Sequence, residues 1–85
     1  MKCFTYILYS RNIDKYYVGY TCDSLENRLA KHNSKNKGYT NQTNDWSIVY
    51  FESFDSKVLA MNREKKIKSW KSRVAIEKLI NAAVS

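Results

Sequence analysis

Hydrophobic and polar positions fall into short runs that predict three β-strands. Residues 3–9 and 15–21 are rich in aromatic and β-branched side chains and are joined by a short polar turn, so they predict an antiparallel hairpin. A third run of the same kind covers residues 46–54. Alternate side chains of a strand share a face, so the hairpin can bring Tyr6 and Tyr17 to the same side of a sheet.

The remaining segments have the wider spacing of apolar residues that is typical of amphipathic helices. Helices are expected at residues 24–33, 57–70 and 73–83, with a polar loop at 34–45. The order β-β-α-β-α-α predicts an α+β fold, in which a small three-stranded antiparallel sheet is flanked by helices. The helix N-caps are expected at Asp23, at Asp55 or Ser56, and at Ser72.

The chain is short and basic, which limits its architecture and its partners. Its 85 residues fit one small domain, 1–85, with a thin core. With 15 Lys and Arg against 8 Asp and Glu, its net charge of +7 favours a polyanionic partner, either nucleic acid or an anionic membrane surface. No apolar stretch approaches the roughly 18 residues of a membrane span, and the N-terminus has no continuous apolar signal region. A cytoplasmic protein is therefore expected.

The two cysteines, Cys3 and Cys22, lack the Cys-x-x-Cys spacing of metal and redox motifs. With only one His in the chain, a structural zinc site is effectively excluded. Free thiols in a reducing compartment are the preferred interpretation, and a disulfide between the two residues is the alternative.

Two helical segments carry candidate functional side chains. Arg28 and His32 are four residues apart and share a helix face, where a guanidinium could hold a phosphate. Glu64 lies on the same stripe as Ala60 and Ile67, which are predicted core residues, and a carboxylate on such a stripe needs a cation or a donor. The structural alternatives are a solvated polar face for Arg28 and His32 and a salt bridge to a neighbouring Lys for Glu64.

Basic residues are concentrated in two segments that are candidates for nucleic-acid binding. The first comprises the end of the first helix and the polar loop after it, where an aromatic ring could also stack on an unpaired base. The second is the run 63–73, the most basic segment of the chain. The candidate contacts are Lys31, Lys35, Lys37, Tyr39, Lys65, Lys68 and Lys71.

Taken together, these motifs resemble the GIY-YIG nuclease family, in particular its small single-domain bacterial members. The matching pieces are Tyr6-Ile7-Leu8, Tyr17-Val18-Gly19-Tyr20-Thr21, Arg28-Leu-x-x-His32-Asn33 and Glu64 within a basic helix, and they span about Phe4 to Ile80. The departures are Phe4-Thr5 in place of the Gly and Ile of the first motif and Val18 in place of Ile in the second.

The resemblance implies a metal-dependent DNA endonuclease. By position, Glu64 would bind one Mg²⁺ or Mn²⁺ ion, Arg28 would clamp the scissile phosphate, and Gly19 would be structural. Tyr17 would accept the proton of the attacking water, with help from Tyr6 and His32, and the choice between Tyr17 and His32 as the base stays open.

Two other functions compete with this one. A non-catalytic nucleic-acid-binding module could keep the same fold, and a peripheral membrane protein could use the same basic helix. The membrane function is disfavoured because Trp70 and Ile67 share the inner side of that helix and are needed for the thin core. Because the chain has no room for a separate recognition domain, a homodimer or a protein partner could supply specificity.

Overall fold

The computed structural model describes residues 2–34 and 43–84, and its secondary structure follows the predicted order β-β-α-β-α-α. The predicted contacts Lys35, Lys37 and Tyr39 lie outside the described residues. The elements are β1 (Cys3–Ser10), β2 (Lys15–Thr21), α1 (Leu25–Asn33), β3 (Ser47–Phe54), α2 (Lys57–Ser69) and α3 (Arg73–Val84).

The three strands form one antiparallel sheet in the order β2-β1-β3, so β1 is central and β2 is an edge strand. In the β1–β2 ladder, Tyr6 lies opposite Gly19 and Leu8 lies opposite Tyr17. The β1–β3 register shifts between Ile7 and Leu8, which marks a bulge in the pairing. The predicted three-stranded sheet is confirmed.

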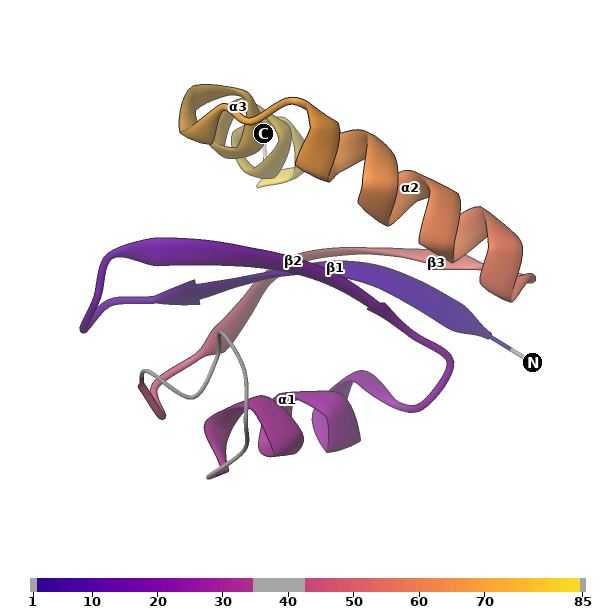
Figure 1. Ribbon diagram of the computed structural model, residues 1–85, viewed down its shortest axis with the longest axis horizontal. Helices are drawn as coiled ribbons and strands as arrows, with labels where there is room; N and C mark the ends of the chain where they lie inside the picture. The colour runs from indigo at the N-terminus through magenta and orange to yellow at the C-terminus, as the bar shows by residue number, and fades with distance from the viewer. Residues whose placement is uncertain (1, 35–42, 85) are drawn as a thin grey trace.

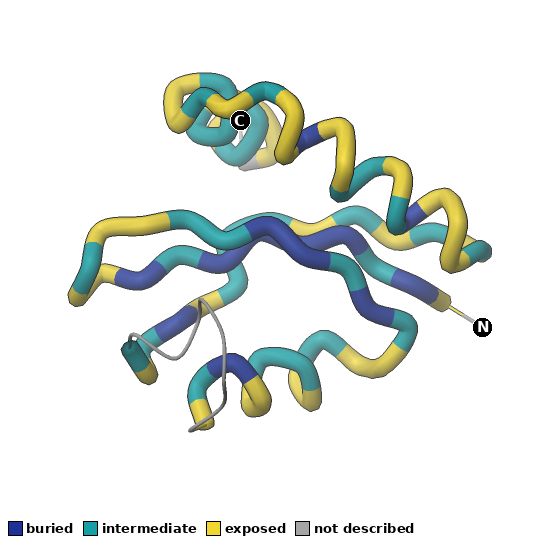
Figure 2. Tube along the Cα trace, in the orientation of Figure 1, coloured by how far each residue is buried: buried dark blue, intermediate teal, exposed yellow. Residues whose placement is uncertain are grey.

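Helices cover both faces of the sheet (Figure 1). On one face, Tyr6 and Leu8 form a buried cluster with Trp46, against which α1 packs. On the other face, Ile7 and Val18 pack with Ile67 of α2, and this cluster includes apolar residues of α3. Strand alternation explains the division, because neighbouring residues of β1 point to opposite faces. Buried residues are concentrated on the central strand β1 and the second half of β2, whereas no residue of β3 is fully buried and the outer surfaces of the helices are exposed (Figure 2).

The cap of α1 differs from the prediction. Ser24, not Asp23, is the N-cap, and its Oγ accepts a hydrogen bond from the Asn27 amide at 3.1 Å. Asp23 instead accepts from the Ser24 amide, at 2.7 Å, and so supports the turn that precedes the cap. Both Ser and Asp favour the N-cap position of a helix. The backbone conformation determines that Ser24, and not Asp23, occupies it here. Ser56 caps α2 and Ser72 accepts from the amide of Ala75, as predicted.

Cys3 and Cys22 form a disulfide, so the expectation of free thiols is wrong for this structure. The physical reason is the strand register. Phe4 pairs with Thr21, so the next residues outward, Cys3 and Cys22, face each other across the end of the hairpin. Composition and the spacing of the cysteines do not show which residues of the two strands are paired, so they could not predict this disulfide.

Candidate active site

A cavity of about 360 Å³ lies beside the edge strand β2 and is lined from both sides of the sheet. It brings together four of the five predicted catalytic residues, which come from β1, β2, α1 and α2. These four are Tyr6, Tyr17, Arg28 and Glu64. Tyr20, Thr21, Cys22 and Lys57 complete the lining.

Gly19 makes the position of Tyr6 possible. A Cβ on residue 19 would lie 2.6 Å from the Tyr6 hydroxyl oxygen and 2.8 Å from its Cζ, which is closer than real Cβ contacts. The absence of a side chain therefore leaves the space that the Tyr6 ring occupies, with the Tyr17 ring on the other side. The sequence predicted a structural role for Gly19, and this contact supplies a physical reason for one.

Tyr6 is the centre of a hydrogen-bonded chain that links α1 to the sheet. Arg28 Nε donates to the Tyr6 hydroxyl oxygen at 3.2 Å, and that hydroxyl lies 2.8 Å from His32 Nε2. A guanidinium can only donate, so the Tyr6 oxygen accepts from Arg28. The direction of the Tyr6–His32 bond depends on the tautomer of His32: the Tyr6 hydroxyl donates to Nε2 when the imidazole proton is on Nδ1, and it accepts when that proton is on Nε2.

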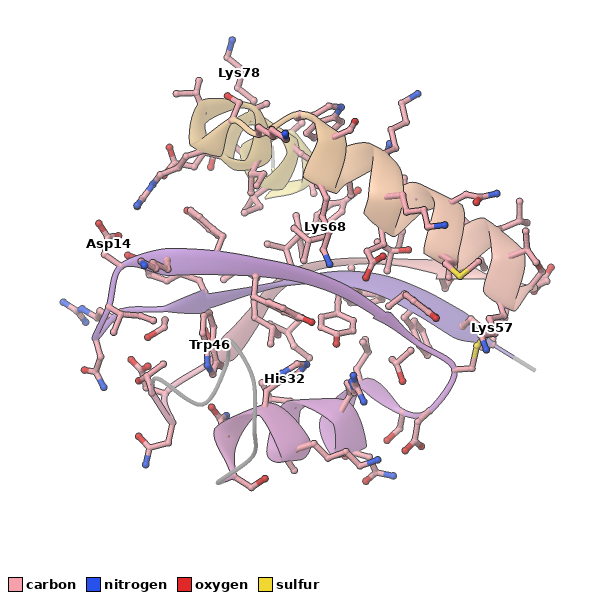
Figure 3. The ribbon with its side chains drawn as sticks, viewed as in Figure 1. Asp14, His32, Trp46, Lys57, Lys68 and Lys78 are labelled. Carbon is pink, nitrogen blue, oxygen red and sulfur yellow. A yellow bond between two sulfur atoms is a disulfide. The ribbon has the colours of Figure 1, made fainter. Side chains whose placement is uncertain are left out.

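Burial explains the protonation states in this chain. Tyr6 is 1% exposed, and burial raises the pKa of its phenol, which keeps it protonated at neutral pH. Burial, together with the positive charge of Arg28, lowers the pKa of His32 to about 4. His32 is hydrogen-bonded to Tyr6 and is not part of the cavity lining. It lies between α1 and the sheet in Figure 3. Its observed contacts are those of a residue that positions Tyr6.

Tyr17 is half-buried on the same face of the sheet as Tyr6. Its ring packs against His32 at a centroid distance of 5.0 Å and against Trp46 at 6.4 Å. The Lys68 ammonium lies 5.6 Å from the centre of the Tyr17 ring, which is within the range of a cation–π contact. Tyr17 is thus fixed by aromatic packing and lies next to a positive charge.

Glu64 faces inward from α2, as the stripe of Ala60 and Ile67 predicted. Both of these residues are fully buried, and the side chain of Glu64 is 14% exposed. Its carboxylate lies 3.4 Å from the ammonium of Lys68, so the predicted salt bridge is also present. That pairing is a long contact to a side chain that is 49% exposed, and the Glu64 side chain still lines the cavity. The ion pair therefore does not close the site.

Four lining residues were not among the predicted site residues: Tyr20, Thr21, Cys22 and Lys57. Tyr20 and Thr21 belong to the predicted second strand and to its motif, but neither was given a role in the site. Lys57 is an exposed residue in the first turn of α2, and its ammonium lies near the sulfur atoms at the end of the hairpin (Figure 3). Only the packing of α2 across the sheet places Lys57 at the cavity, so no local signal could have found it.

The remaining described lysines of the predicted nucleic-acid surface lie on α1 and α2 or just after α2. Lys31, Lys65, Lys68 and Lys71 are all exposed. Lys68 points from α2 toward the sheet in Figure 3, whereas Lys78 of α3 points away from it. Lys68 is thus the member of this group that reaches the candidate site.

The donor set around the cavity fits a hard divalent ion. In residues 2–34 and 43–84, no three His, Cys, Asp or Glu side chains gather into a cluster that could hold a metal. Glu64 alone offers a carboxylate to the cavity, together with phenolic oxygens. Mg²⁺ commonly keeps several waters and takes one or two carboxylates plus substrate phosphate oxygens, so a single carboxylate is compatible with it. The same set is unsuitable for a structural zinc ion.

The sequence and the fold are similar to those of known proteins. The sequence profile described as the GIY-YIG catalytic domain matches residues 2–79. A UPF0213 protein of Streptococcus pyogenes serotype M3 is 43% identical over 74 residues, which cover 85% of this chain and 77% of that protein. The solution NMR structure of the UPF0213 protein BH0048 from Bacillus halodurans has a TM-score of 0.61 and 34% identity, and the match covers 96% of this chain and 85% of that one.

Proposed function

Because the chain belongs to the GIY-YIG catalytic domain family, we propose that it is a metal-dependent endonuclease that hydrolyses phosphodiester bonds in DNA. The observation that carries the proposal is the convergence of Tyr6, Tyr17, Arg28 and Glu64 on one cavity. These side chains come from four elements that are far apart in sequence. Their meeting provides an acceptor for a proton, a donor for a phosphate and a ligand for a cation in one place.

Glu64 is the proposed ligand of one Mg²⁺ or Mn²⁺ ion. When bound, such an ion would neutralise charge on the phosphate and on the leaving oxygen. Arg28 already donates through Nε to Tyr6, and this bond holds the guanidinium at the cavity. Its further N–H groups are proposed to donate to a non-bridging phosphate oxygen as charge develops there.

Tyr17 is the proposed acceptor of the proton from the attacking water, and three observations favour it over His32 and Tyr6. The Nε2 atom of His32 is already hydrogen-bonded to Tyr6, and the pKa of about 4 makes its imidazole a weak base. The Tyr6 hydroxyl is committed to both Arg28 and His32. Tyr17 lines the cavity and lies next to the Lys68 ammonium. We therefore assign Tyr6 and His32 to positioning.

DNA is the proposed substrate because the chain carries a net charge of +7, exposed Lys57 lines the cavity, and exposed Lys68 contacts two of its lining residues, Glu64 and Tyr17. Contacts from Lys31, Lys65, Lys68 and Lys71 to phosphates would not depend on base sequence. Binding of this kind weakens steeply as salt rises, because each neutralised phosphate releases counterions. Sequence specificity would then come from a second copy of the chain or from a protein partner.

Two alternatives make different predictions. A binding module on the same fold would hold DNA and never cut it, although nothing in its function would require Glu64 to face the cavity. A peripheral membrane protein would bind anionic vesicles. Within the described part of the chain, no helix has the length and apolar character needed to cross a bilayer.

The direct test is a cleavage panel of end-labelled single-stranded, duplex and branched DNA and of RNA, with Mg²⁺, Mn²⁺ or EDTA. The proposal predicts cutting of at least one DNA with metal and none with EDTA. Tyr17→Phe should lose most of the activity, while Tyr50→Phe on β3 is the control that should keep it. Binding without cutting under every condition would support the module instead.

A further inference from the structure

A second cavity, of about 390 Å³, lies next to the candidate site and shares Tyr17 with it. Its walls come from β2 on one side and from α2 and α3 on the other. Val18 and Ile67, which are 6% and 0% exposed, form an apolar floor, and Ile76 adds an apolar wall. We call this second cavity the β2–α3 groove.

The wall formed by Tyr16 is held in place by three neighbours. The Tyr16 hydroxyl donates to Glu77 at 3.2 Å, and the Arg73 guanidinium lies 5.2 Å from the centre of the ring. The Tyr9 ring packs beside it at a centroid distance of 4.8 Å. The Tyr16 wall of the groove is therefore preformed, because contacts with β1 and α3 fix this side chain.

The chemistry of the groove defines its occupant. The interior is apolar, and the rim carries the ammonium groups of Lys68 and Lys71, which are both exposed. A ligand that fits must combine an apolar body with an anionic attachment. A nucleobase on a sugar–phosphate strand has that combination, because the flat faces of the base are apolar and the backbone is anionic.

The spacing along α2 relates the groove to the candidate site. Glu64 lines the first cavity, and Ile67 and Lys68 line the groove. Residues three and four apart in a helix are separated by about 4.5 to 6 Å along the axis. This separation is short enough for one nucleotide next to the scissile phosphate to span it. A strand with a phosphate at Glu64 can therefore place a neighbouring base at the groove.

We propose that the β2–α3 groove binds an unpaired nucleobase that flanks the scissile phosphate. This inference rests on the proposed nuclease function and deepens it by naming the substrate class. A base inside the groove is removed from its partner strand, so the substrate is single-stranded DNA or DNA with a displaced base at the cut. The groove has few fixed polar groups beyond its rim, so all four bases are accepted.

The test uses single abasic positions in a labelled DNA strand, which remove a base and leave the backbone intact. Cleavage at the bond next to an abasic position should fall by about 5- to 150-fold, the range that corresponds to the loss of one base–protein stacking contact. Bonds further along the same strand should be cut as before. Cleavage is measured separately at each bond. A shift of the strand to another binding register therefore does not conceal the loss of cleavage next to the abasic position.

Two variants of α3 separate the groove from general stability. Ile76→Ala removes part of the groove wall, so a normal base makes fewer contacts there. The difference in cleavage between normal and abasic positions should therefore become smaller. Val74→Ala, at a position that is 61% exposed and outside the groove, should keep the full effect. Equal cleavage next to abasic and normal positions in the wild type would overturn the proposal, and so would an abasic effect that Ile76→Ala leaves unchanged.

A binding measurement keeps this inference distinct from the nuclease proposal. In EDTA, a short thymidine strand should bind at least about tenfold more tightly than a fully abasic strand of the same length. If intact DNA is bound in this base-dependent way and is never cut, the nuclease proposal fails and the groove remains. If DNA is cut and the two strands bind equally, the groove assignment fails and the nuclease proposal remains.

Discussion

Tyr6 and Gly19 face each other across the β1–β2 ladder, and the Tyr6 ring occupies the space that a side chain on residue 19 would need. This relationship places the Tyr6 hydroxyl where both Arg28 and His32 reach it. A single glycine in an edge strand thus determines the position of three polar side chains around the cavity.

Gly19→Ala should destabilise the fold and reduce cleavage together. The new Cβ would lie 2.6 Å from the Tyr6 hydroxyl oxygen, and relief of such a clash costs about 1–3 kcal/mol. Chemical denaturation measures the loss. The double variant with Tyr6→Ala should cost little more than Tyr6→Ala alone, because the clash is then absent. Additive losses would show that the close approach is not the cause.

The pKa of His32 predicts a dependence of stability on pH. The folded pKa of about 4 lies below the ordinary value of 6.5, so between these values the unfolded chain binds a proton that the folded chain does not. Stability should therefore fall as pH is lowered through this window. Denaturation curves of wild type and His32→Gln should differ in this slope.

The same pKa can be measured directly, because the chain has one His. Its imidazole NMR signals should titrate near pH 4 in the folded protein. Titration near 6.5 would mean that His32 is solvated, and the Tyr6–His32 contact would then be wrong.

Arg28→Lys should lower the cleavage rate more than it lowers DNA affinity. Lysine keeps the charge but lacks the planar set of donors that can serve Tyr6 and a phosphate at once. Loss of a donor to a developing negative charge costs about 10²–10³-fold in rate. Single-turnover cleavage and binding in EDTA separate the two effects. Arg11→Lys, in the exposed hairpin turn, is the matched control and should change neither.

The Cys3–Cys22 disulfide should stabilise the fold. The two residues are 19 apart in sequence, and a cross-link of this kind is typically worth about 2–4 kcal/mol. Thermal unfolding with and without a thiol reductant measures this difference, and Cys22→Ser should abolish it. Detection of two free thiols in the folded, unreduced protein would contradict the disulfide.

The sheet and much of the candidate site could be predicted from local patterns. Strand alternation put Tyr6 and Tyr17 on one face, and the stripe of Ala60, Glu64 and Ile67 turned the carboxylate inward. Both patterns depend only on residues a few positions apart. The side-chain directions that these patterns predict are found in the folded chain because the strands and helices formed at the predicted residues.

What the sequence did not provide depends on how elements meet. The disulfide follows from the hairpin register, and Lys57 reaches the cavity only because α2 packs across the sheet. The contact of His32 with Tyr6 and its absence from the cavity lining make it a poor candidate for the base, and both follow from the packing of α1. The β2–α3 groove needs the placement of α3, which no motif specifies.

The most direct test of the central claim is cleavage by Glu64→Gln. This change removes the carboxylate charge and keeps the shape of the side chain. The ion pair between Glu64 and the exposed Lys68 contributes about 0.5 kcal/mol or less to stability, so the variant should still fold. Glu26→Gln, on the exposed surface of α1, is the control. We predict that, with Mg²⁺ or Mn²⁺, Glu64→Gln binds DNA in its folded form without cutting it, while Glu26→Gln cuts like the wild type. A folded Glu64→Gln protein that cuts DNA at the wild-type rate would contradict the account.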